Sequence, residues 1–195
     1  MTALMLCSAY LVGAIPAGFL LYKKIGKADI RETGSRNIGA TNVLRTAGWK
    51  VAVPVLLFDI GKGLLPVLLA KRWFDSPWIA GAAGLAAILG HCFPVYIRFR
   101  GGKGVSTTLG ALSGLAWLPL LCSLGFFLMV IVLSRYVSLS SLTALAAFPL
   151  LAALFKAGPE VVSGGILIFV LVTFQHRENI RRLIKGEENK LGEKR

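Results

Sequence analysis

The sequence is poor in the residues on which metal and disulfide chemistry depend. Its 195 residues include three cysteines and two histidines, and Cys7, Cys92 and Cys122 lie in apolar surroundings without a CxxC spacing. An odd number of cysteines in this arrangement predicts neither a disulfide framework nor a zinc site. We therefore expect no metal and no other cofactor.

Acidic residues are scarce as well. Nine Asp and Glu stand against 22 Lys and Arg, which gives a net charge of +13, and such an excess is common in nucleic-acid-binding proteins. However, 55% of the residues are hydrophobic and the mean hydropathy is +0.71, whereas soluble domains are roughly 45–50% apolar even when glycine is counted. The composition thus disfavours a nucleic-acid partner. It predicts one all-α, polytopic membrane domain over residues 1–195, with basic loops.

Two signatures of covalent and acid–base catalysis are also missing. No GxSxG motif occurs, and neither His91 nor His176 begins an HxxxxD motif, because Tyr96 and Arg181 stand where the Asp would be. The sequence therefore offers no clear pair of nucleophile and base.

Basic residues are absent before the first apolar run, and they follow it at Lys23, Lys24 and Lys27. A secretory signal peptide has the opposite order. We expect residues 3–22 to remain in the protein as a span whose amino end lies outside.

Long apolar runs are abundant. A helix needs about 20 apolar residues to cross the hydrocarbon layer, and six runs approach or exceed that length: 3–22, 51–70, 77–97, 105–133, 139–155 and 160–175. The longest of them, 105–133, contains Trp117, Leu118 and Pro119 near its centre. This run can form one long span or two short ones.

The distribution of basic residues decides between these alternatives, because cytoplasmic loops carry an excess of Lys and Arg. If the run 105–133 turns back near Pro119, the basic tail and the basic first loop both lie inside. The residues that then remain elsewhere are Lys62, Lys71, Arg72 and Lys156. We therefore predict seven transmembrane helices, two of them short and between 105 and 133, with the amino end outside and the carboxyl end in the cytoplasm.

With this topology four polar stretches meet at one membrane face: 34–45, 98–108, 135–141 and 176–189. The first offers backbone N–H groups, hydroxyls and the guanidinium of Arg45, which together can hold a phosphate or carboxylate. A solvated loop, with Arg45 anchoring a helix at the headgroups, is an equally good interpretation.

The second stretch places three glycines around Lys103 and is followed by a predicted helix. Glycines let the backbone approach a ligand closely, and the N-terminus of a helix attracts anions. The stretch is not a Walker A loop, because Ile97 and Gly104 stand where Gly and Ser or Thr are required. A flexible basic hairpin without a ligand is the alternative.

The third and fourth stretches are less distinctive. Ser138 is predicted to cap a helix, while Ser141, one turn further, can line a polar cavity. In the fourth, His176 and Asn179 share one helical stripe, and Glu178 is spaced to pair with Arg181 or Arg182. A basic amphipathic tail lying on anionic lipid explains the same pattern.

Two charged residues lie inside the second span. Asp59 and Lys62 are three positions apart, so we predict that they neutralise each other as a structural pair. His91, which is deeply embedded in its own span, is predicted to be a structural hydrogen-bonding group.

The motifs GSRNIGATNVLR at 34–45, GHCFPVYIRFRGGKGVSTTLG at 90–110, RYVSLSSLTA at 135–144 and HRENIRRLIKGEENKL at 176–191 resemble those of the PlsY family of bacterial acyl-phosphate:glycerol-3-phosphate acyltransferases. The resemblance extends over essentially the whole chain. One departure is Arg36, where the family is expected to have glycine; its charge can alter the loop or strengthen a phosphate contact.

The resemblance implies transfer of a fatty acyl group from acyl phosphate to the 1-hydroxyl of sn-glycerol 3-phosphate, which yields lysophosphatidic acid on the cytoplasmic side of the bacterial plasma membrane. It implies catalytic roles for Ser35, Arg45, Lys103, His176 and Asn179, and a structural supporting role for Glu178. Further substrate-binding positions follow from the same similarity: Asn37, Thr41, Asn42, Gly101, Gly102, Gly104 and Ser141.

Acyl phosphate already carries a good leaving group, so positioning and charge stabilisation can suffice for catalysis. We expect no covalent acyl-enzyme, and the proton of the attacking hydroxyl passes either to His176 or to the phosphate of the donor. The expected partners are the two substrates and membrane lipid; contact with the soluble enzyme that makes acyl phosphate is left open. Competing classes are a transporter of phosphorylated small molecules and a membrane scaffold that recruits anionic partners.

Overall fold

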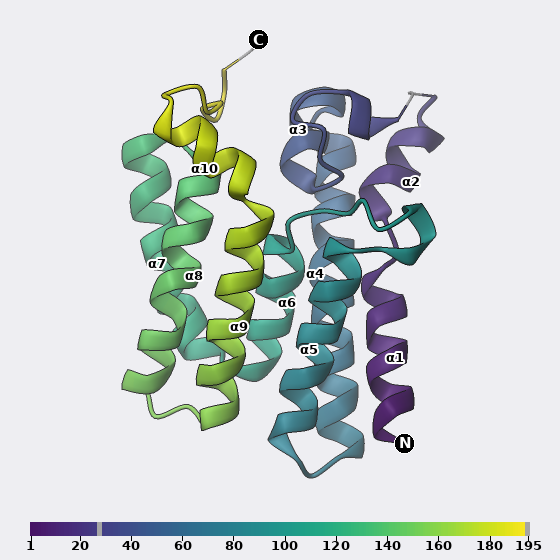
Figure 1. Ribbon diagram of the computed structural model, residues 1–195, viewed down its shortest axis with the longest axis vertical. Coiled ribbons are helices and arrows are strands. Elements are labelled where there is room, and N and C mark those ends of the chain that lie inside the picture. Colours follow the sequence, from purple (N-terminus) through teal and green to yellow (C-terminus); the bar gives the residue numbers. More distant parts are fainter. Residues whose placement is uncertain (27–28, 194–195) are drawn as a thin grey trace. The chain divides into compact units, whose positions relative to one another are not determined.

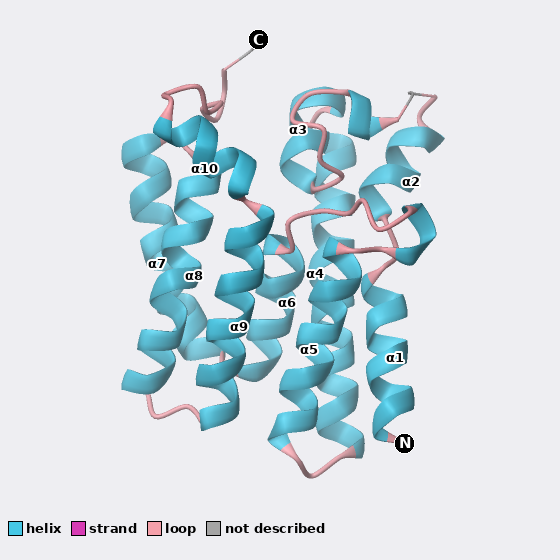
Figure 2. Ribbon diagram, viewed as in Figure 1, coloured by secondary structure: helices cyan, strands magenta, loops and turns pink. Residues whose placement is uncertain are grey.

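The computed structural model describes residues 1–26 and 29–193, and the regular structure within these ranges is entirely helical. Figures 1 and 2 show helices joined by short loops, and no strand occurs within these ranges. The all-α prediction is confirmed. Lys27, Lys194 and Arg195, which the predicted topology puts on the cytoplasmic side, lie outside the described residues.

The chain forms two compact units, residues 1–114 and 115–195. The first unit contains α1 (Thr2–Gly13), α2 (Ala17–Lys24), η1 (Ile30–Glu32), α3 (Ala40–Ala47), α4 (Trp49–Trp73), α5 (Pro77–Cys92), η2 (Val95–Ile97) and nearly all of α6 (Val105–Leu115). The second contains α7 (Trp117–Ser134), α8 (Val137–Leu154), α9 (Pro159–Gln175) and α10 (Arg177–Ile184). A single acyltransferase domain over residues 1–195 stays a prediction.

Small residues bring the helices of the first unit close together. A β-carbon on Gly13 of α1 would lie 2.1 Å from the carbonyl oxygen of Ala87 in α5, and one on Gly90 of α5 would lie 2.1 Å from that of Tyr10. The same close approach joins α4 and α6 at Gly63 and Gly110. Such contacts between small residues are typical of helix packing in membranes, where van der Waals contact replaces the hydrophobic effect.

One end of the first unit carries both polar stretches that the sequence predicts for it. The loop from α2 to α3 and the loop from α5 to α6 emerge at this end, whereas the α4–α5 connection lies at the other (Figure 1). A buried apolar cluster holds the loops together and includes Ile30, Ile38 and Ile97. The Arg31 guanidinium also donates a hydrogen bond of 3.3 Å to the Ile97 carbonyl.

The second unit is built on α7, α8 and α9. The Ser123 hydroxyl of α7 donates to the Ala144 carbonyl of α8 over 2.5 Å, and Gly165 of α9 leaves room for the ring of Phe148. At His176 the chain bends by 64° between α9 and α10. The fourth stretch therefore turns away from the last span.

Within the residues that the structure describes, five helical segments are long and apolar enough to cross a membrane, or six if α9 and α10 form one span. The run 105–133 does divide into two helices, with the break at Ala116 rather than near Pro119. Of the two, α7 has 18 residues and α6 has 11, which is short against the roughly 20 residues that a span needs. The count of seven spans and the orientation of the termini stay predictions.

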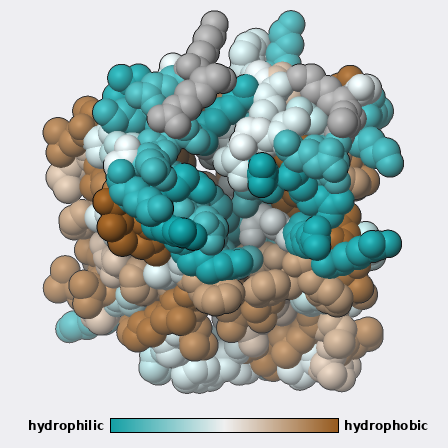
Figure 3. Space-filling model, turned by 45° about the horizontal axis from the view of Figure 1, so that its top comes forward, coloured by the Kyte–Doolittle hydropathy of each residue, from teal (hydrophilic) through white to brown (hydrophobic). Residues whose placement is uncertain are grey.

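The surfaces of the units have a membrane pattern. Large apolar side chains are exposed on the helix flanks, for example Leu57, Val132 and Leu150, which would be costly in water over so large an area. Hydrophilic residues gather at the loop-bearing end that Figure 3 brings forward, and hydrophobic residues cover the flanks behind it. Both units thus have a polar end and apolar sides.

Candidate functional site

The loop from Gly34 to Gly39 is organised by one buried amide. The Asn42 side chain accepts a hydrogen bond of 2.8 Å from the Ser35 N–H, and its Nδ2 donates to the carbonyls of Asn37 at 2.8 Å and Thr33 at 3.0 Å. Asn42 is 1% exposed. This predicted binding residue therefore shapes the loop from within, and the loop in turn holds Ser35 half-buried at its surface.

Positive charge borders this loop. Arg45, in the last turn of α3, is half-buried, and Arg36 is exposed. The charge of Arg31 is compensated by Asp29 at 2.5 Å, and hydrogen bonding from Arg31 lowers the pKa of the Asp29 carboxyl. Arg36 and Arg45 add two further positive charges beside this loop.

The second stretch contains the glycine–lysine segment, residues 101–104. A β-carbon on Gly101 would lie 2.2 Å from the His91 carbonyl oxygen, and one on Gly102 would lie 2.0 Å from the His91 Nε2. Gly104 has a φ of 87° and is followed at once by α6. The segment therefore requires glycine on both sides of Lys103, and it brings Lys103 to the N-terminus of a helix, where an anion is stabilised.

The backbone before this segment is strained. Arg98 and Phe99 have φ values of 57° and 60°, in the left-handed region that side chains with a β-carbon rarely adopt. Hydrogen bonds hold this conformation, from the Phe99 N–H to the Pro94 carbonyl at 2.9 Å and from the Gly102 N–H to the His91 carbonyl at 3.0 Å. Strain of this kind is often found at ligand sites.

The charged pair inside the second span is present as predicted. Lys62 Nζ lies 2.8 Å from Asp59 Oδ1, and the two side chains are 2% exposed. His91 Nδ1 lies 3.5 Å from the same carboxylate oxygen, with the imidazole almost completely buried. The prediction of a structural pair at Asp59 and Lys62 is confirmed, and His91 lies beside it.

In the second unit, His176 lies at the bend between α9 and α10. Its Nδ1 is 2.8 Å from the Val172 carbonyl, and the residue is 3% exposed. A carbonyl oxygen only accepts hydrogen bonds, so Nδ1 carries the proton, and the lone pair of the neutral ring is on Nε2. The helix end thus fixes both the orientation and the tautomer of His176.

A buried carboxylate that the sequence pattern did not single out fixes the second predicted catalytic residue of this unit. Glu188 Oε1 accepts from Asn179 Nδ2 at 2.6 Å and from the Ser138 hydroxyl at 2.9 Å, and Oε2 accepts from Arg182 Nε at 2.7 Å. Glu178 is exposed on α10 instead. Glu188 therefore supports Asn179 and is the partner of Arg182, so the predicted pairing of Glu178 with Arg182 is not formed. A supporting role for Glu178 stays a prediction.

Two consequences follow from the Glu188 contacts. Burial acts to raise the pKa of Glu188, but the hydrogen bonds from Asn179, Arg182 and Ser138 outweigh it, so the pKa lies below its ordinary range. In addition, the prediction that Ser138 caps α8 is wrong, because Ser138 lies inside the helix and its hydroxyl bonds Glu188. No sequence spacing pointed to Glu188, since its partners Arg182, Asn179 and Ser138 are 6, 9 and 50 residues away, none of them at the spacing of neighbours on a helix.

The structure thus brings the predicted residues together within each unit. Ser35, Asn37, Thr41, Asn42 and Arg45 belong to one loop and its helix, which shares an end of the first unit with Lys103. Ser141 is buried in α8, where its hydroxyl donates to the Val137 carbonyl. The meeting of all four stretches at one membrane face stays a prediction.

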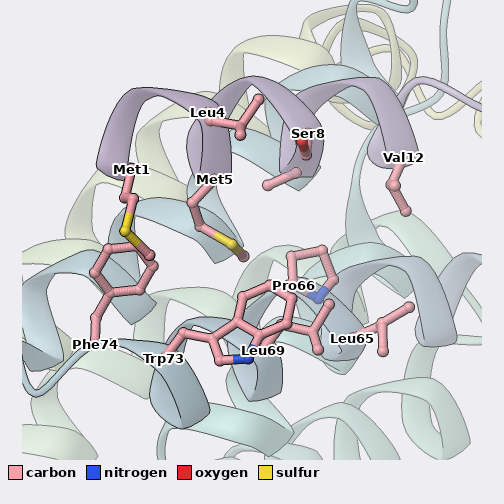
Figure 4. A pocket seen from close by; sticks show the side chains of 11 residues that line it. Met1, Leu4, Met5, Ser8, Val12, Leu65, Pro66, Leu69, Trp73 and Phe74 are labelled. Atoms are coloured by element: carbon pink, nitrogen blue, oxygen red, sulfur yellow. The ribbon is translucent and has the colours of Figure 1, made fainter.

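The first unit also has an apolar cavity of about 330 Å³ between α1 and α4. Figure 4 shows Met1 and Met5 facing Leu69, Trp73 and Phe74 across it. It lies at the amino end of α1, away from the polar loops, and no Lys or Arg lines it. This cavity does not suit a phosphate. Nor do three His, Cys, Asp or Glu side chains gather into a metal site anywhere in the described part of the chain.

The amino-acid sequence is similar to known proteins over almost its full length. A family model described as "Glycerol-3-phosphate acyltransferase" matches residues 3–186. The glycerol-3-phosphate acyltransferase of Geotalea daltonii is 50% identical over 186 residues, which cover 95% of each chain. The protein of the same name from Geobacter sulfurreducens is 49% identical over 183 residues, 93% of each chain.

Two solved structures have the same fold. Both are crystal structures of PlsY (YgiH), described as an integral membrane glycerol 3-phosphate acyltransferase. The glycerol 3-phosphate form has a TM-score of 0.93 and 39% identity, and the match covers 98% of this chain and 96% of the other. The lysophosphatidic acid form has a TM-score of 0.90 and 38% identity, with 98% and 95% covered.

Proposed function

Because the chain belongs to the glycerol-3-phosphate acyltransferase family, we propose that it transfers a fatty acyl group from acyl phosphate to the 1-hydroxyl of sn-glycerol 3-phosphate. The products are lysophosphatidic acid and inorganic phosphate. One observation carries the acceptor and the product: the chain matches, over 98% of its length, an acyltransferase crystallised in a glycerol 3-phosphate form and in a lysophosphatidic acid form.

The proposed donor comes from the family resemblance, and the chemistry of the loops supports it. The glycine–lysine segment offers a cation, backbone that a ligand can approach closely, and the first turn of α6, which together suit the phosphate of an acyl phosphate. Ser35 and Arg45, with Asn37, Thr41 and Asn42 shaping their loop, would hold the second phosphorylated substrate. Ser141 is proposed as a further substrate-binding residue.

The reaction needs no covalent intermediate. The 1-hydroxyl oxygen attacks the acyl carbonyl carbon, the bond between that carbon and the phosphate oxygen breaks, and phosphate leaves with the electron pair. The hydroxyl proton passes to His176 Nε2 or to the departing phosphate. The Val172 carbonyl supports the first route, because it keeps the ring proton on Nδ1. Asn179, fixed by Glu188, would orient a substrate oxygen beside His176.

The proposed location follows from the charge pattern of the chain. The polar ends with Lys103 and with His176 would face the cytoplasm across the bacterial inner membrane, since most basic residues belong to these stretches. The water-soluble substrate would then enter from the cytoplasm, while the fatty chain stays beside the apolar flanks. A soluble enzyme that forms acyl phosphate could deliver the donor at this same face.

A purified-protein assay tests the proposal. Protein in detergent is mixed with labelled glycerol 3-phosphate and one of three donors: acyl phosphate, acyl coenzyme A or an acyl carrier-protein thioester. We expect labelled lysophosphatidic acid and stoichiometric phosphate release with acyl phosphate alone. Detergent micelles enclose no compartment, so turnover excludes a purely transporting protein. A trapped acyl-enzyme or ping-pong kinetics would overturn direct transfer, and use of a thioester instead would overturn the donor.

Three variants sharpen this assay. Lys103→Ala should lower kcat/KM about 100-fold or more, by analogy with the loss of one preorganised charge-stabilising group, and Lys103→Arg should lower it less because the charge is retained. Lys71→Ala is the matched control, since Lys71 bonds the Gly114 carbonyl away from both loops. If His176→Gln retains a near-normal rate, the proton of the attacking hydroxyl passes to the departing phosphate. If well-folded wild-type protein shows no turnover in this assay, the proposal that it is an acyltransferase is wrong.

A further inference from the structure

The buried cluster of Asp59, Lys62 and His91 has no part in the chemistry proposed above. The three residues are 2%, 4% and 3% exposed and bring two formal charges and an imidazole into the apolar interior of the first unit. Burying such groups is costly, and well-packed apolar residues of similar size often give equal or greater stability. Stability alone is therefore a weak reason for this cluster.

The contacts of the cluster lead to the polar end of the first unit. The imidazole of His91 fills the space beside Gly102, where any β-carbon would come within 2.0 Å of Nε2. The His91 carbonyl accepts the Gly102 N–H at 3.0 Å. Side chain and backbone of one residue thus both hold Gly102, which directly precedes Lys103.

The other members of the cluster restrict the imidazole. Asp59 Oδ1 is 3.5 Å from His91 Nδ1 and 2.8 Å from Lys62 Nζ. Lys62 Nζ also donates to the Ile15 carbonyl at 2.9 Å, at the break between α1 and α2. The carboxylate is on α4, and its partner Lys62 is anchored in turn at the helix break.

We propose that His91 is a positioning residue for the glycine–lysine segment, and that Asp59 and Lys62 fix its imidazole against Gly102. A shift of the ring moves the backbone on which Lys103 stands, and displacements near 1 Å cost about 100-fold in well-oriented reactions. This inference rests on the proposed function, in which that segment holds the acyl phosphate. The cluster acts through Lys103 and touches neither substrate.

Kinetics of His91→Gln and His91→Ala test the proposal. We expect the KM for acyl phosphate to rise about 10- to 100-fold and the KM for glycerol 3-phosphate to change by less than about threefold, a change too small to mark a lost contact. Val67→Ala is the matched control, because Val67 is fully buried in the same unit and packs against Gly114. It should lower the thermal unfolding temperature and leave both KM values unchanged.

Gly102→Ala provides the second arm. Because its β-carbon collides with the imidazole, Gly102→Ala should raise the KM for acyl phosphate. In the double variant with His91→Ala, the KM for acyl phosphate should rise by less than the product of the two single increases. Multiplicative effects of the two substitutions would overturn a role through Gly102. So would equal increases in both KM values.

A measurement without substrate separates this inference from the proposed function. Amide hydrogen exchange of residues 98–104 should become faster in His91→Gln and stay unchanged in Val67→Ala. Unchanged exchange in His91→Gln overturns the positioning role even if the enzyme uses acyl phosphate. Faster exchange in a protein that does not use acyl phosphate supports the positioning role and defeats the proposed donor.

Discussion

Arg36 stands in a backbone conformation that few side chains adopt. Its φ is 56°, in the left-handed region where a β-carbon costs about 1–2 kcal/mol. The motif that the chain resembles is expected to have glycine here, and the structure gives the physical reason, because the loop turns at this residue. The loop therefore keeps this turn with a strained arginine, whose positive charge is exposed.

Replacing Arg36 with glycine should reveal both effects. The relief of strain exceeds the entropic cost of glycine, about 0.5–1 kcal/mol, so we expect Arg36→Gly to unfold about 1–3 °C higher. If the charge assists an anionic substrate, the KM for that substrate rises in the same variant. Thermal unfolding and steady-state kinetics in detergent measure the two quantities.

Arg36→Ala is the control for this prediction, since it removes the charge and keeps the strained β-carbon. It should match Arg36→Gly in KM and lack the gain in unfolding temperature. Equal unfolding temperatures for the two variants would show that the positive φ carries no strain.

Residues with close partners in the sequence were the ones that could be predicted. Asp59 and Lys62 are one helical turn apart, and two charges within an apolar run have few other ways to be neutralised. The hydrogen bonds of Asn42 within its loop were not predicted, and Glu188 was not singled out at all, because their partners depend on the folded loops. Glu178 was the nearer acid to Arg182, yet the chain turns after α10 and brings in Glu188.

At the scale of elements, the segment after α10 closes over the turn between α7 and α8. The Leu191 N–H donates to the Arg135 carbonyl at 2.8 Å, and the Arg135 guanidinium donates to the Leu191 carbonyl at 2.9 Å. Glu188 adds the bond to Ser138. This segment thus ties the helix of Asn179 to the rest of the second unit.

The acid stability of the second unit should depend on Glu188. A carboxyl whose folded pKa is below its unfolded value stabilises the fold above the unfolded pKa, and the contribution is lost as the pH falls through the folded value. For Glu188 this loss begins below the ordinary value of 4.5. We expect the wild-type unfolding temperature to fall more steeply between pH 5 and about pH 3 than that of Glu188→Gln.

At neutral pH the same variant should unfold several degrees lower, because a hydrogen bond to a charged group contributes about 1.5–3 kcal/mol. Its kcat should also fall, since the amide has one acceptor oxygen and cannot accept from both Asn179 and Arg182 as the two carboxylate oxygens do. Glu187→Gln, at the exposed neighbouring position, should follow the wild type in both measurements. If the unfolding temperature falls equally steeply with decreasing pH in Glu188→Gln and in wild type, the role assigned to this carboxylate is wrong.

Helices followed from the apolar runs more reliably than their breaks did. The predicted run 77–97 corresponds to α5 with η2, and 160–175 corresponds to α9. The break before α2 was not predicted, although Pro16 cannot supply the N–H that a continuous helix would need. The carbonyl of Ile15 that this break exposes is the one that Lys62 binds, so the missed element is part of the buried cluster.

For the molecule as a whole, the charge pattern and the elements agree within each unit. In the first unit, the loops with Arg36 and Lys103 share one end. The last turn of α4, which contains Lys71, leads into the α4–α5 connection at the other end. In the second, Arg135 bonds the tail at one end, and Lys156 belongs to the α8–α9 connection at the other. The sequence additionally predicts which side of the membrane each polar end faces. That prediction depends on whether the run 105–133 reverses direction.

Cysteine accessibility decides that question. In a protein whose Cys7, Cys92 and Cys122 have been replaced, single cysteines are placed at Glu32, Asp75 and Glu187, which are exposed in their loops. Intact cells are treated with a membrane-impermeant maleimide. We expect labelling at position 75 alone, and labelling at 32 and 187 only after the cells are opened, because both basic ends then face the cytoplasm. Opposite protection of positions 32 and 187 would mean that the run crosses once, and Arg45 and His176 could not then serve one reaction.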